Sequence, residues 1–84
     1  MDDLKFEILD ELYFVISFSD LQNTLGMEAT LLKRELGELV AKKWVKCFSS
    51  VSDELPEEEI DYERNYQNYH YLASKEGLIE HNSR

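Results

Sequence analysis

Apolar residues recur at helical spacing near the start of the chain, with mostly charged residues between them. The positions are Leu4, Ile8, Leu9, Leu12 and Tyr13. This spacing is typical of an amphipathic helix and predicts one over residues 2–14. Residues 15–18, VISF, then break the period with a β-branched, apolar-rich run, which predicts a turn or a very short strand.

Two further helical patterns follow, separated by a glycine. Ser19 and Gln22 have the spacing of a capping box, so a short helix is expected over residues 19–25. Gly26 suits the left-handed conformation that ends a helix. The helical period then resumes over residues 28–43, at Leu32, Leu36, Leu39 and Val40. Two amphipathic helices around a short turn that contains glycine are the signature of a helix-turn-helix.

The remainder of the chain favours strands. Residues 44–51, WVKCFSSV, are rich in β-branched and aromatic residues, and residues 69–73, YHYLA, predict a second strand beside them. The stretch between them, 52–65, is expected to be a loop at the tip of a hairpin. Alternatively, Pro56 and the three glutamates after it could start one or two helical turns. Ser74 is a candidate N-cap for a short terminal helix.

Charge is unevenly distributed along the 84 residues, whose formal net charge is −9. Residues 53–63, the acidic segment, contain seven acidic side chains and no basic one. Residues 28–46 contain five bases against three acids. An acidic chain is repelled by nucleic acid and by anionic membranes, but the expected third helix is locally cationic.

The order helix, short strand, helix, turn, helix, strand, loop, strand resembles that of winged helix-turn-helix domains. The stretch LGMEATLLKRELGELVAKKWV is similar to the recognition-helix segment of many small bacterial transcriptional regulators, in which an apolar pair, here Trp44-Val45, opens the next strand. Residues 73–78, ASKEGL, are similar to the helix start that follows the second wing strand. The resemblance implies one α+β domain over residues 1–84, with a three-helix core, a two- or three-stranded antiparallel wing hairpin and a short C-terminal helix.

The resemblance also implies that the third helix reads duplex DNA in the major groove. Arg34 would pair with guanine, Thr30 would bond to a base edge or a phosphate, and Lys33 would contact phosphate. The flanking DNA backbone would be held by Lys42, Lys43 and Lys46. Two features depart from this pattern. Glu28 lies at the end of the helix that would enter the groove, and the acidic wing would bring its negative charges toward phosphate.

Two functions follow from these observations. The first is a DNA-binding transcriptional regulator that works as a homodimer through its first or terminal helix, because a single winged helix covers little DNA. The alternative is a winged-helix protein-protein interaction module that does not bind DNA, whose acidic surface docks on a basic partner or imitates nucleic acid. The net charge favours the second function, and the cationic third helix favours the first.

Catalytic, metal and membrane chemistry are not expected. Cys47 is the only cysteine, so no intramolecular disulfide can form, and no sequence cue gives it a partnered base. His70 and His81 lack zinc-ligand spacing, and the acidic segment lacks the order of a calcium-binding loop. No apolar run reaches the roughly 18 to 20 residues of a membrane-crossing helix, and the acidic N-terminus is unlike a signal peptide. A cytoplasmic non-enzyme without a cofactor is therefore expected.

Overall fold

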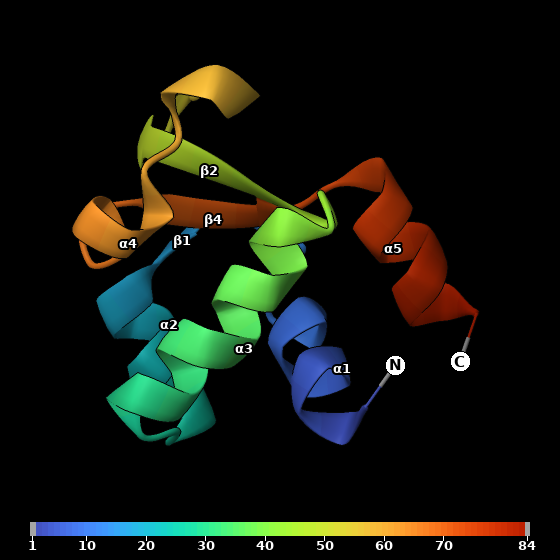
Figure 1. The fold of residues 1–84 in the computed structure, drawn as a ribbon. Helices are drawn as coiled ribbons and strands as arrows, with labels where there is room; N and C mark the ends of the chain where they lie inside the picture. Colours follow the sequence, from blue (N-terminus) through green and yellow to red (C-terminus); the bar gives the residue numbers. More distant parts are fainter. Residues whose placement is uncertain (1, 84) are drawn as a thin grey trace.

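The computed structural model describes residues 2–83, which form a mixed α+β fold. The elements in chain order are α1 (Asp3–Asp10), β1 (Ile16–Ser17), α2 (Phe18–Leu25), α3 (Ala29–Ala41), β2 (Val45–Ser50), β3 (Asp53–Glu54), the 3-10 helix η1 (Glu57–Glu59), α4 (Tyr62–Asn65), β4 (His70–Ala73) and α5 (Lys75–Asn82). Helices α1, α2 and α3 lie together beneath the sheet, and α5 lies beyond one end of it (Figure 1). The α+β class predicted from the sequence is confirmed.

The four strands pair antiparallel in the order β1-β4-β2-β3. In the central pair, Val45 lies opposite Ala73 and Cys47 lies opposite Tyr71, and all four residues are buried. Side chains alternate across a strand, so these four share the face of the sheet that packs on the helices. The sequence predicts two or three strands, with a turn or a very short strand over residues 15–18, where β1 lies. It does not predict β3, which is two residues long and too short to show an alternating pattern.

One cluster of buried apolar side chains joins the helices to the sheet. Its members are Ile8, Leu9, Leu12, Phe18, Leu21, Leu32, Leu36, Leu39, Val45, Cys47, Tyr69, Tyr71 and Ala73. Tyr71 is fully buried, and its hydroxyl donates a hydrogen bond to the Tyr66 carbonyl at 2.6 Å. That bond satisfies the polar end of a ring that otherwise fills the core.

Helix α1 is shorter than the expected range of 2–14. It ends at Asp10, and the chain then turns toward the sheet, where the Leu12 carbonyl accepts a hydrogen bond from the Ala73 N–H at 2.9 Å. Leu12 nevertheless remains fully buried. The apolar period therefore continues past the end of the helix, because the turn keeps the same side chains in the core.

Helix α2 begins earlier than expected. The residues before it form the very short strand β1, and Ser17 caps the helix by accepting a hydrogen bond from the Asp20 N–H at 3.1 Å. The predicted capping box of Ser19 and Gln22 is therefore wrong. The observed start places Phe18 and the next apolar residue three positions on, Leu21, on one buried face.

Helix α3 spans Ala29–Ala41 instead of the expected 28–43. Glu28 is its N-cap, and its carboxylate accepts hydrogen bonds from the N–H groups of Thr30 and Leu31, both at 3.1 Å. These bonds lower the pKa of Glu28. The carboxylate expected to oppose DNA is thus engaged in capping its own helix.

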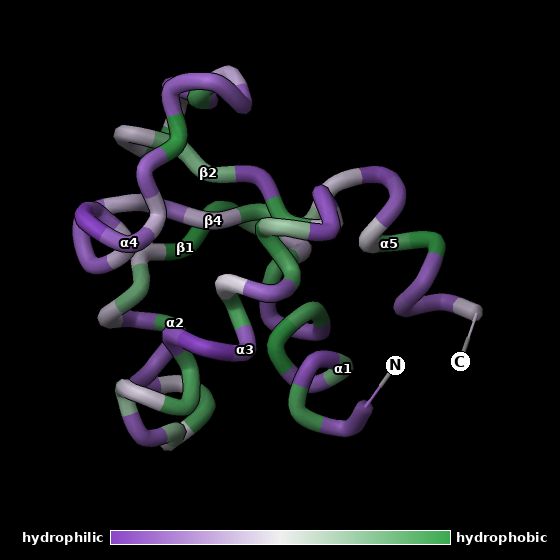
Figure 2. Tube along the Cα trace, in the orientation of Figure 1, coloured by the Kyte–Doolittle hydropathy of each residue, from purple (hydrophilic) through white to green (hydrophobic). Residues whose placement is uncertain are grey.

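The stretch 52–65 is more ordered than the expected loop. It contains β3, η1 and α4, and Pro56 is the N-cap of η1, so a helical turn does follow the proline. In Figure 2 this part of the tube is largely purple with short green interruptions, which marks it as mainly hydrophilic. The predicted cap of the terminal helix is confirmed, because the Ser74 hydroxyl accepts a hydrogen bond from the Gly77 N–H at 3.1 Å.

A nearly buried lysine joins α1 to α3. The Nζ atom of Lys5 lies 2.9 Å from a carboxylate oxygen of Glu35, 2.7 Å from one of Glu38 and 3.2 Å from one of Asp2. The side chains of Lys5 and Glu35 are 8% and 7% exposed. The hydrogen bonds that the Lys5 ammonium donates to the carboxylates of Glu38 and Glu35 raise the pKa of Lys5 and lower the pKa of Glu38. The amphipathic faces of the two helices therefore meet at a charged contact above the apolar core.

We predict that Lys5→Met destabilises the protein by about 2 kcal/mol, because it leaves the buried Glu35 carboxylate without its closest cation. Adding Glu35→Gln to that variant should recover a large part of the loss, since the uncompensated charge is then removed. Urea denaturation of the two variants and the wild type measures both effects. Equal stability of Lys5→Met and the wild type would contradict the assigned role.

We further predict that stability falls as the pH rises above 9. Burial raises the pKa of Cys47 from 9.0 to about 12, so the unfolded chain loses this proton first. The stabilising effect of the neutral thiol is complete below pH 9 and is lost as the pH rises toward 12. The raised pKa values of Lys5, Tyr62 and Tyr71 act in the same direction. Urea denaturation between pH 8 and pH 11 should show the fall, and Cys47→Ala should make it less steep; a flat profile would contradict the prediction.

Candidate nucleic-acid interface

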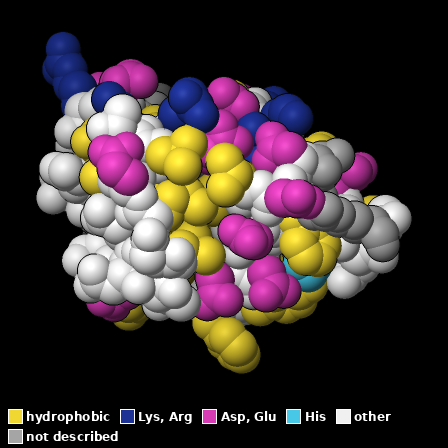
Figure 3. All heavy atoms as spheres, turned by 90° about the horizontal axis from the view of Figure 1, so that it is seen from below, with side chains coloured by type: hydrophobic (Ala, Val, Ile, Leu, Met, Phe, Trp, Pro, Cys, Tyr) yellow, Lys and Arg dark blue, Asp and Glu magenta, His cyan; other side chains and the backbone are white. Residues whose placement is uncertain are grey.

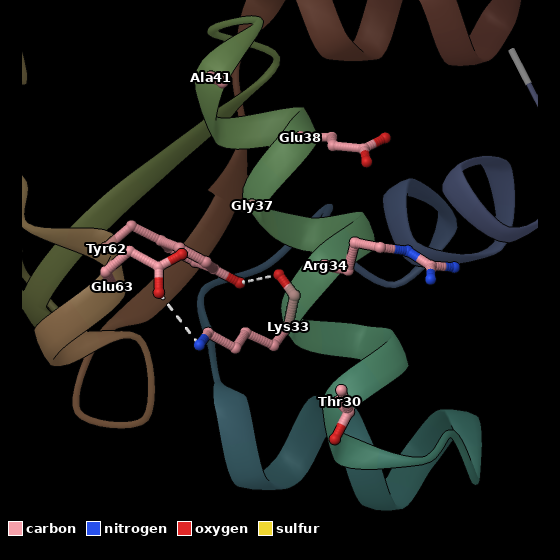
Figure 4. A pocket seen from close by; sticks show the side chains of 8 residues that line it. All are labelled: Thr30, Lys33, Arg34, Gly37, Glu38, Ala41, Tyr62 and Glu63. Atoms are coloured by element: carbon pink, nitrogen blue, oxygen red, sulfur yellow. Dashed lines mark hydrogen bonds and ion pairs between the residues drawn. The ribbon is translucent and has the colours of Figure 1, made fainter.

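The outward face of α3 forms one wall of a groove, and α4 forms the other. The groove, called here the α3 groove, has a volume of about 560 Å³. It is lined by Thr30, Lys33, Arg34, Gly37, Glu38, Ala41, Tyr62 and Glu63. Figure 4 shows Tyr62 and Glu63 reaching from α4 toward Lys33, while Arg34 and Glu38 point away from α4. Three of the residues expected to contact DNA, Thr30, Lys33 and Arg34, therefore line one groove.

Tyr62 fixes the position of α4 against α3. Its hydroxyl donates a hydrogen bond to the Lys33 carbonyl at 2.7 Å. Its ring lies so close to Gly37 that a Cβ atom at that position would come within 2.8 Å of the ring. Glycine is unfavourable inside a helix, yet here it gives the ring room to approach the α3 backbone. The acidic segment, which includes Tyr62, is thereby attached to the helix expected to read DNA.

Lys33 is paired with a carboxylate of the acidic segment. Its Nζ atom lies 3.0 Å from a carboxylate oxygen of Glu63 and 5.0 Å from the centre of the Tyr66 ring. The Glu63 carboxylate raises the pKa of Lys33. A phosphate approaching Lys33 would therefore meet a position already held by an anion.

Arg34 is the most accessible of the candidate residues on α3 that carry charge. Its side chain is 65% exposed, and its Nε atom lies 3.2 Å from a carboxylate oxygen of Glu35. Thr30 is exposed in the first turn of the helix. Both side chains reach solvent, but Arg34 shares its surroundings with Glu35 and Glu38.

The three remaining candidates lie at and beyond the C-terminal end of α3. Lys43 Nζ lies 3.3 Å from a carboxylate oxygen of Glu57, and Lys46 Nζ lies 3.5 Å from one of Glu54. Lys42 instead lies over the Trp44 ring, with its Nζ atom 4.8 Å from the ring centre. Of the three, two are therefore also paired with the acidic segment.

Lys43 adopts a backbone conformation that is rare for a lysine. Its φ angle is 66°, in the left-handed region. The N–H of Trp44 reaches back to the Leu39 carbonyl at 3.0 Å, and the N–H of Lys43 reaches the Val40 carbonyl at 3.0 Å. These two bonds form a Schellman motif, a helix ending in which glycine is the usual residue at this position. The turn starts β2 and brings Lys43 beside Glu57.

The structure thus places four of the five candidate cations next to carboxylates instead of gathering them into a bare basic surface. Seen from below, the Lys and Arg side chains stand along one edge of the molecule with Asp and Glu side chains beside them (Figure 3). The sequence pattern did not reveal this pairing. Three apolar or aromatic residues interrupt the acidic segment: Leu55, Ile60 and Tyr62. They could have indicated that the segment packs on the domain, because all three are partly buried against the core.

Other chemistry is limited in the described part of the chain. No group of three or more His, Cys, Asp or Glu side chains among residues 2–83 is arranged to hold a metal ion. The Cys47 thiol is buried and its pKa is raised, so it is poorly available as a thiolate. His81 stacks on Phe6 with ring centres 4.3 Å apart, and its Nδ1 atom lies 2.8 Å from the Tyr13 hydroxyl. His81 thus fastens α5 to α1.

The helices among residues 2–83 are each too short or too polar to cross a membrane. Comparison of the chain with models of protein families, with curated proteins and with solved structures found no match.

We predict that Gly37→Ala displaces Tyr62 and loosens α4 while α3 stays folded. The added Cβ cannot share its position with the Tyr62 ring, whereas alanine favours the helix by about 1 kcal/mol over glycine. Amide hydrogen exchange at residues 61–65 should become faster, and the NMR contact between the Tyr62 ring and residue 37 should vanish. Thr30→Ala, on the same side of α3, is the control and should change neither. Persistence of the ring contact in Gly37→Ala would contradict the assignment.

Proposed function

We propose that the chain is a winged-helix domain that works as a protein-protein interaction module and does not read duplex DNA. The winged-helix assignment is supported by the sequence resemblance, by three helices packed on one face of the sheet, and by the antiparallel pairing of β2 with β4 after α3. On this assignment α3 takes the place of the recognition helix, and the acidic segment takes the place of the wing.

The observation that carries the proposal is the pairing of three candidate cations with the acidic segment. Lys33, Lys43 and Lys46 lie within 3.5 Å of carboxylate oxygens from Glu63, Glu57 and Glu54, respectively. These carboxylates stand where phosphate groups would stand in a DNA complex. A duplex would have to displace all three to use the lysines.

The remaining charges of the segment strengthen this argument. After the three paired glutamates, four acidic side chains of the acidic segment remain: Asp53, Glu58, Glu59 and Asp61. All four residues are exposed. Affinity for duplex DNA comes largely from cations that replace the counterions of phosphate, and these four acids would oppose that exchange. The exposed charge of the segment suits a basic protein surface instead.

The acidic segment is attached to the domain, which also favours the interaction module. A mobile wing could move away and expose the lysines to DNA. Exposed ion pairs contribute little stability by themselves. The segment is held in addition by the Tyr62 hydrogen bond to Lys33 and by partial burial of Leu55 and Ile60 against the core. The acidic surface is therefore part of the folded domain, as a docking surface must be.

The test is a titration of fluorescent duplex DNA of random sequence at about 50 mM salt. We predict no binding by the wild type, because the carboxylates beside the lysines and the four further acids of the segment repel phosphate. The triple variant Glu54→Gln, Glu57→Gln, Glu63→Gln should bind measurably, with an affinity that falls linearly with salt on logarithmic axes.

The matched control carries the same change in net charge on exposed residues away from α3: Glu7→Gln, Asp20→Asn and Glu80→Gln. It should not bind DNA. Binding by the wild type with that salt dependence would overturn the proposal and restore the DNA-reading function. Equal gains in both triple variants would show that only net charge matters, and not the pairing with the lysines.

A further inference from the structure

A second hollow lies between the C-terminal end of α3, β2 and residues 54–60. Its volume is about 220 Å³. Its apolar walls come from Val40, Val45, Cys47, Leu55 and Ile60. Four residues of the acidic segment, Glu54, Leu55, Glu57 and Ile60, are among the lining residues. The acidic segment therefore forms one wall of the hollow, which is called here the strap pocket.

Charged side chains surround the apolar walls of the strap pocket. The lining includes two lysines, Lys43 and Lys46, and three glutamates, Glu54, Glu57 and Glu76. Glu58 and Glu59, which follow Glu57 in η1, are exposed. Acidic side chains therefore outnumber basic ones around an apolar interior.

The two ion pairs at this rim are exposed and readily exchanged. Lys43 and Glu57 have side chains 68% and 70% exposed, and Lys46 and Glu54 have side chains 41% and 50% exposed. Pairs of this kind contribute little stability, because water competes for both charges. An arriving arginine could replace either lysine and bind a carboxylate through two parallel hydrogen bonds.

The lining of the α3 groove does not favour a basic partner in the same way. Its lining has two cations, Lys33 and Arg34, and two anions, Glu38 and Glu63. Its charges are balanced, and Tyr62 already occupies the space beside Gly37. The strap pocket is smaller, but it combines an apolar interior with a net negative rim.

We propose that the strap pocket binds a single apolar side chain of a basic protein segment, with flanking lysines or arginines held by Glu54, Glu57 and Glu76. This proposal rests on the proposed function, because it names the docking site and the partner class of the interaction module. The volume admits one side chain of the size of leucine and excludes a helix or a strand. Burial of such a side chain supplies the affinity, and the charges add direction and selectivity.

The probes are three blocked pentapeptides titrated into ¹⁵N-labelled protein and followed by NMR. The first is Arg-Arg-Leu-Arg-Arg, the second replaces its leucine by glycine, and the third replaces its arginines by glutamates. The leucine peptide should bind at least about tenfold more tightly than the glycine peptide, as expected from burial of one side chain. The acidic peptide should not bind. The largest shifts should fall on the amides of Val45, Cys47, Leu55 and Ile60.

A pair of double variants tests the rim. Glu57→Gln with Glu76→Gln should weaken the leucine peptide about tenfold or more, because two of the carboxylates that would hold its arginines lose their charge. Glu7→Gln with Glu80→Gln changes the net charge equally on the surfaces of α1 and α5 and should leave the affinity within about twofold of the wild type.

Several results would contradict the assignment of the strap pocket as the binding site. Equal affinity for the leucine and glycine peptides, shifts centred on another surface, or equal effects of the two double variants would each remove the strap pocket as the site. Absence of binding by all three peptides would do the same. The interaction module itself would still stand after any of these results, because it is the duplex DNA titration that tests it.

Discussion

The contact between Tyr62 and Gly37 decides what the outward face of α3 can do. The ring rests on the helix where glycine leaves room for it, and its hydroxyl is bonded to the Lys33 carbonyl at 2.7 Å. Because Tyr62 lies inside the acidic segment, this one contact brings the segment's carboxylates to the lysines of α3 and β2. The electrostatic character of the helix then depends on its neighbours as well as on its own residues.

Helix α3 is also held from the opposite side. Lys5 of α1 reaches Glu35 and Glu38, so the helix is fixed by a nearly buried charged contact on one side and by an aromatic contact on the other. The two contacts differ in physical kind. The Lys5 contact satisfies charges that have lost water, whereas the Tyr62 contact gains packing and one hydrogen bond. Of the three candidate residues on α3, Arg34 and Thr30 are exposed and Lys33 is partly buried.

The same segment supplies both the anions paired with Lys33, Lys43 and Lys46 and one wall of the strap pocket. Its apolar residues, Leu55 and Ile60, pack inward while its glutamates remain in solvent. A stretch of this composition would be expected to remain a solvated loop. It folds onto the domain because a few apolar side chains provide burial that the ion pairs alone do not. An acidic surface beside an apolar hollow is the consequence.

The amino-acid sequence was sufficient to predict the elements that depend on local patterns. The apolar period of Leu32, Leu36 and Leu39 predicts α3, and the Ser74 cap predicts the start of α5, because both depend on residues within a few positions of each other. The strand β3, the early start of α2 and the pairing of Lys33 with Glu63 became evident only in the folded structure. Those two residues are thirty positions apart, and nothing in the spacing of either one specifies the other. The sequence shows how many acidic and basic side chains the chain has and where they lie along it. Which of them form ion pairs depends on how the chain folds.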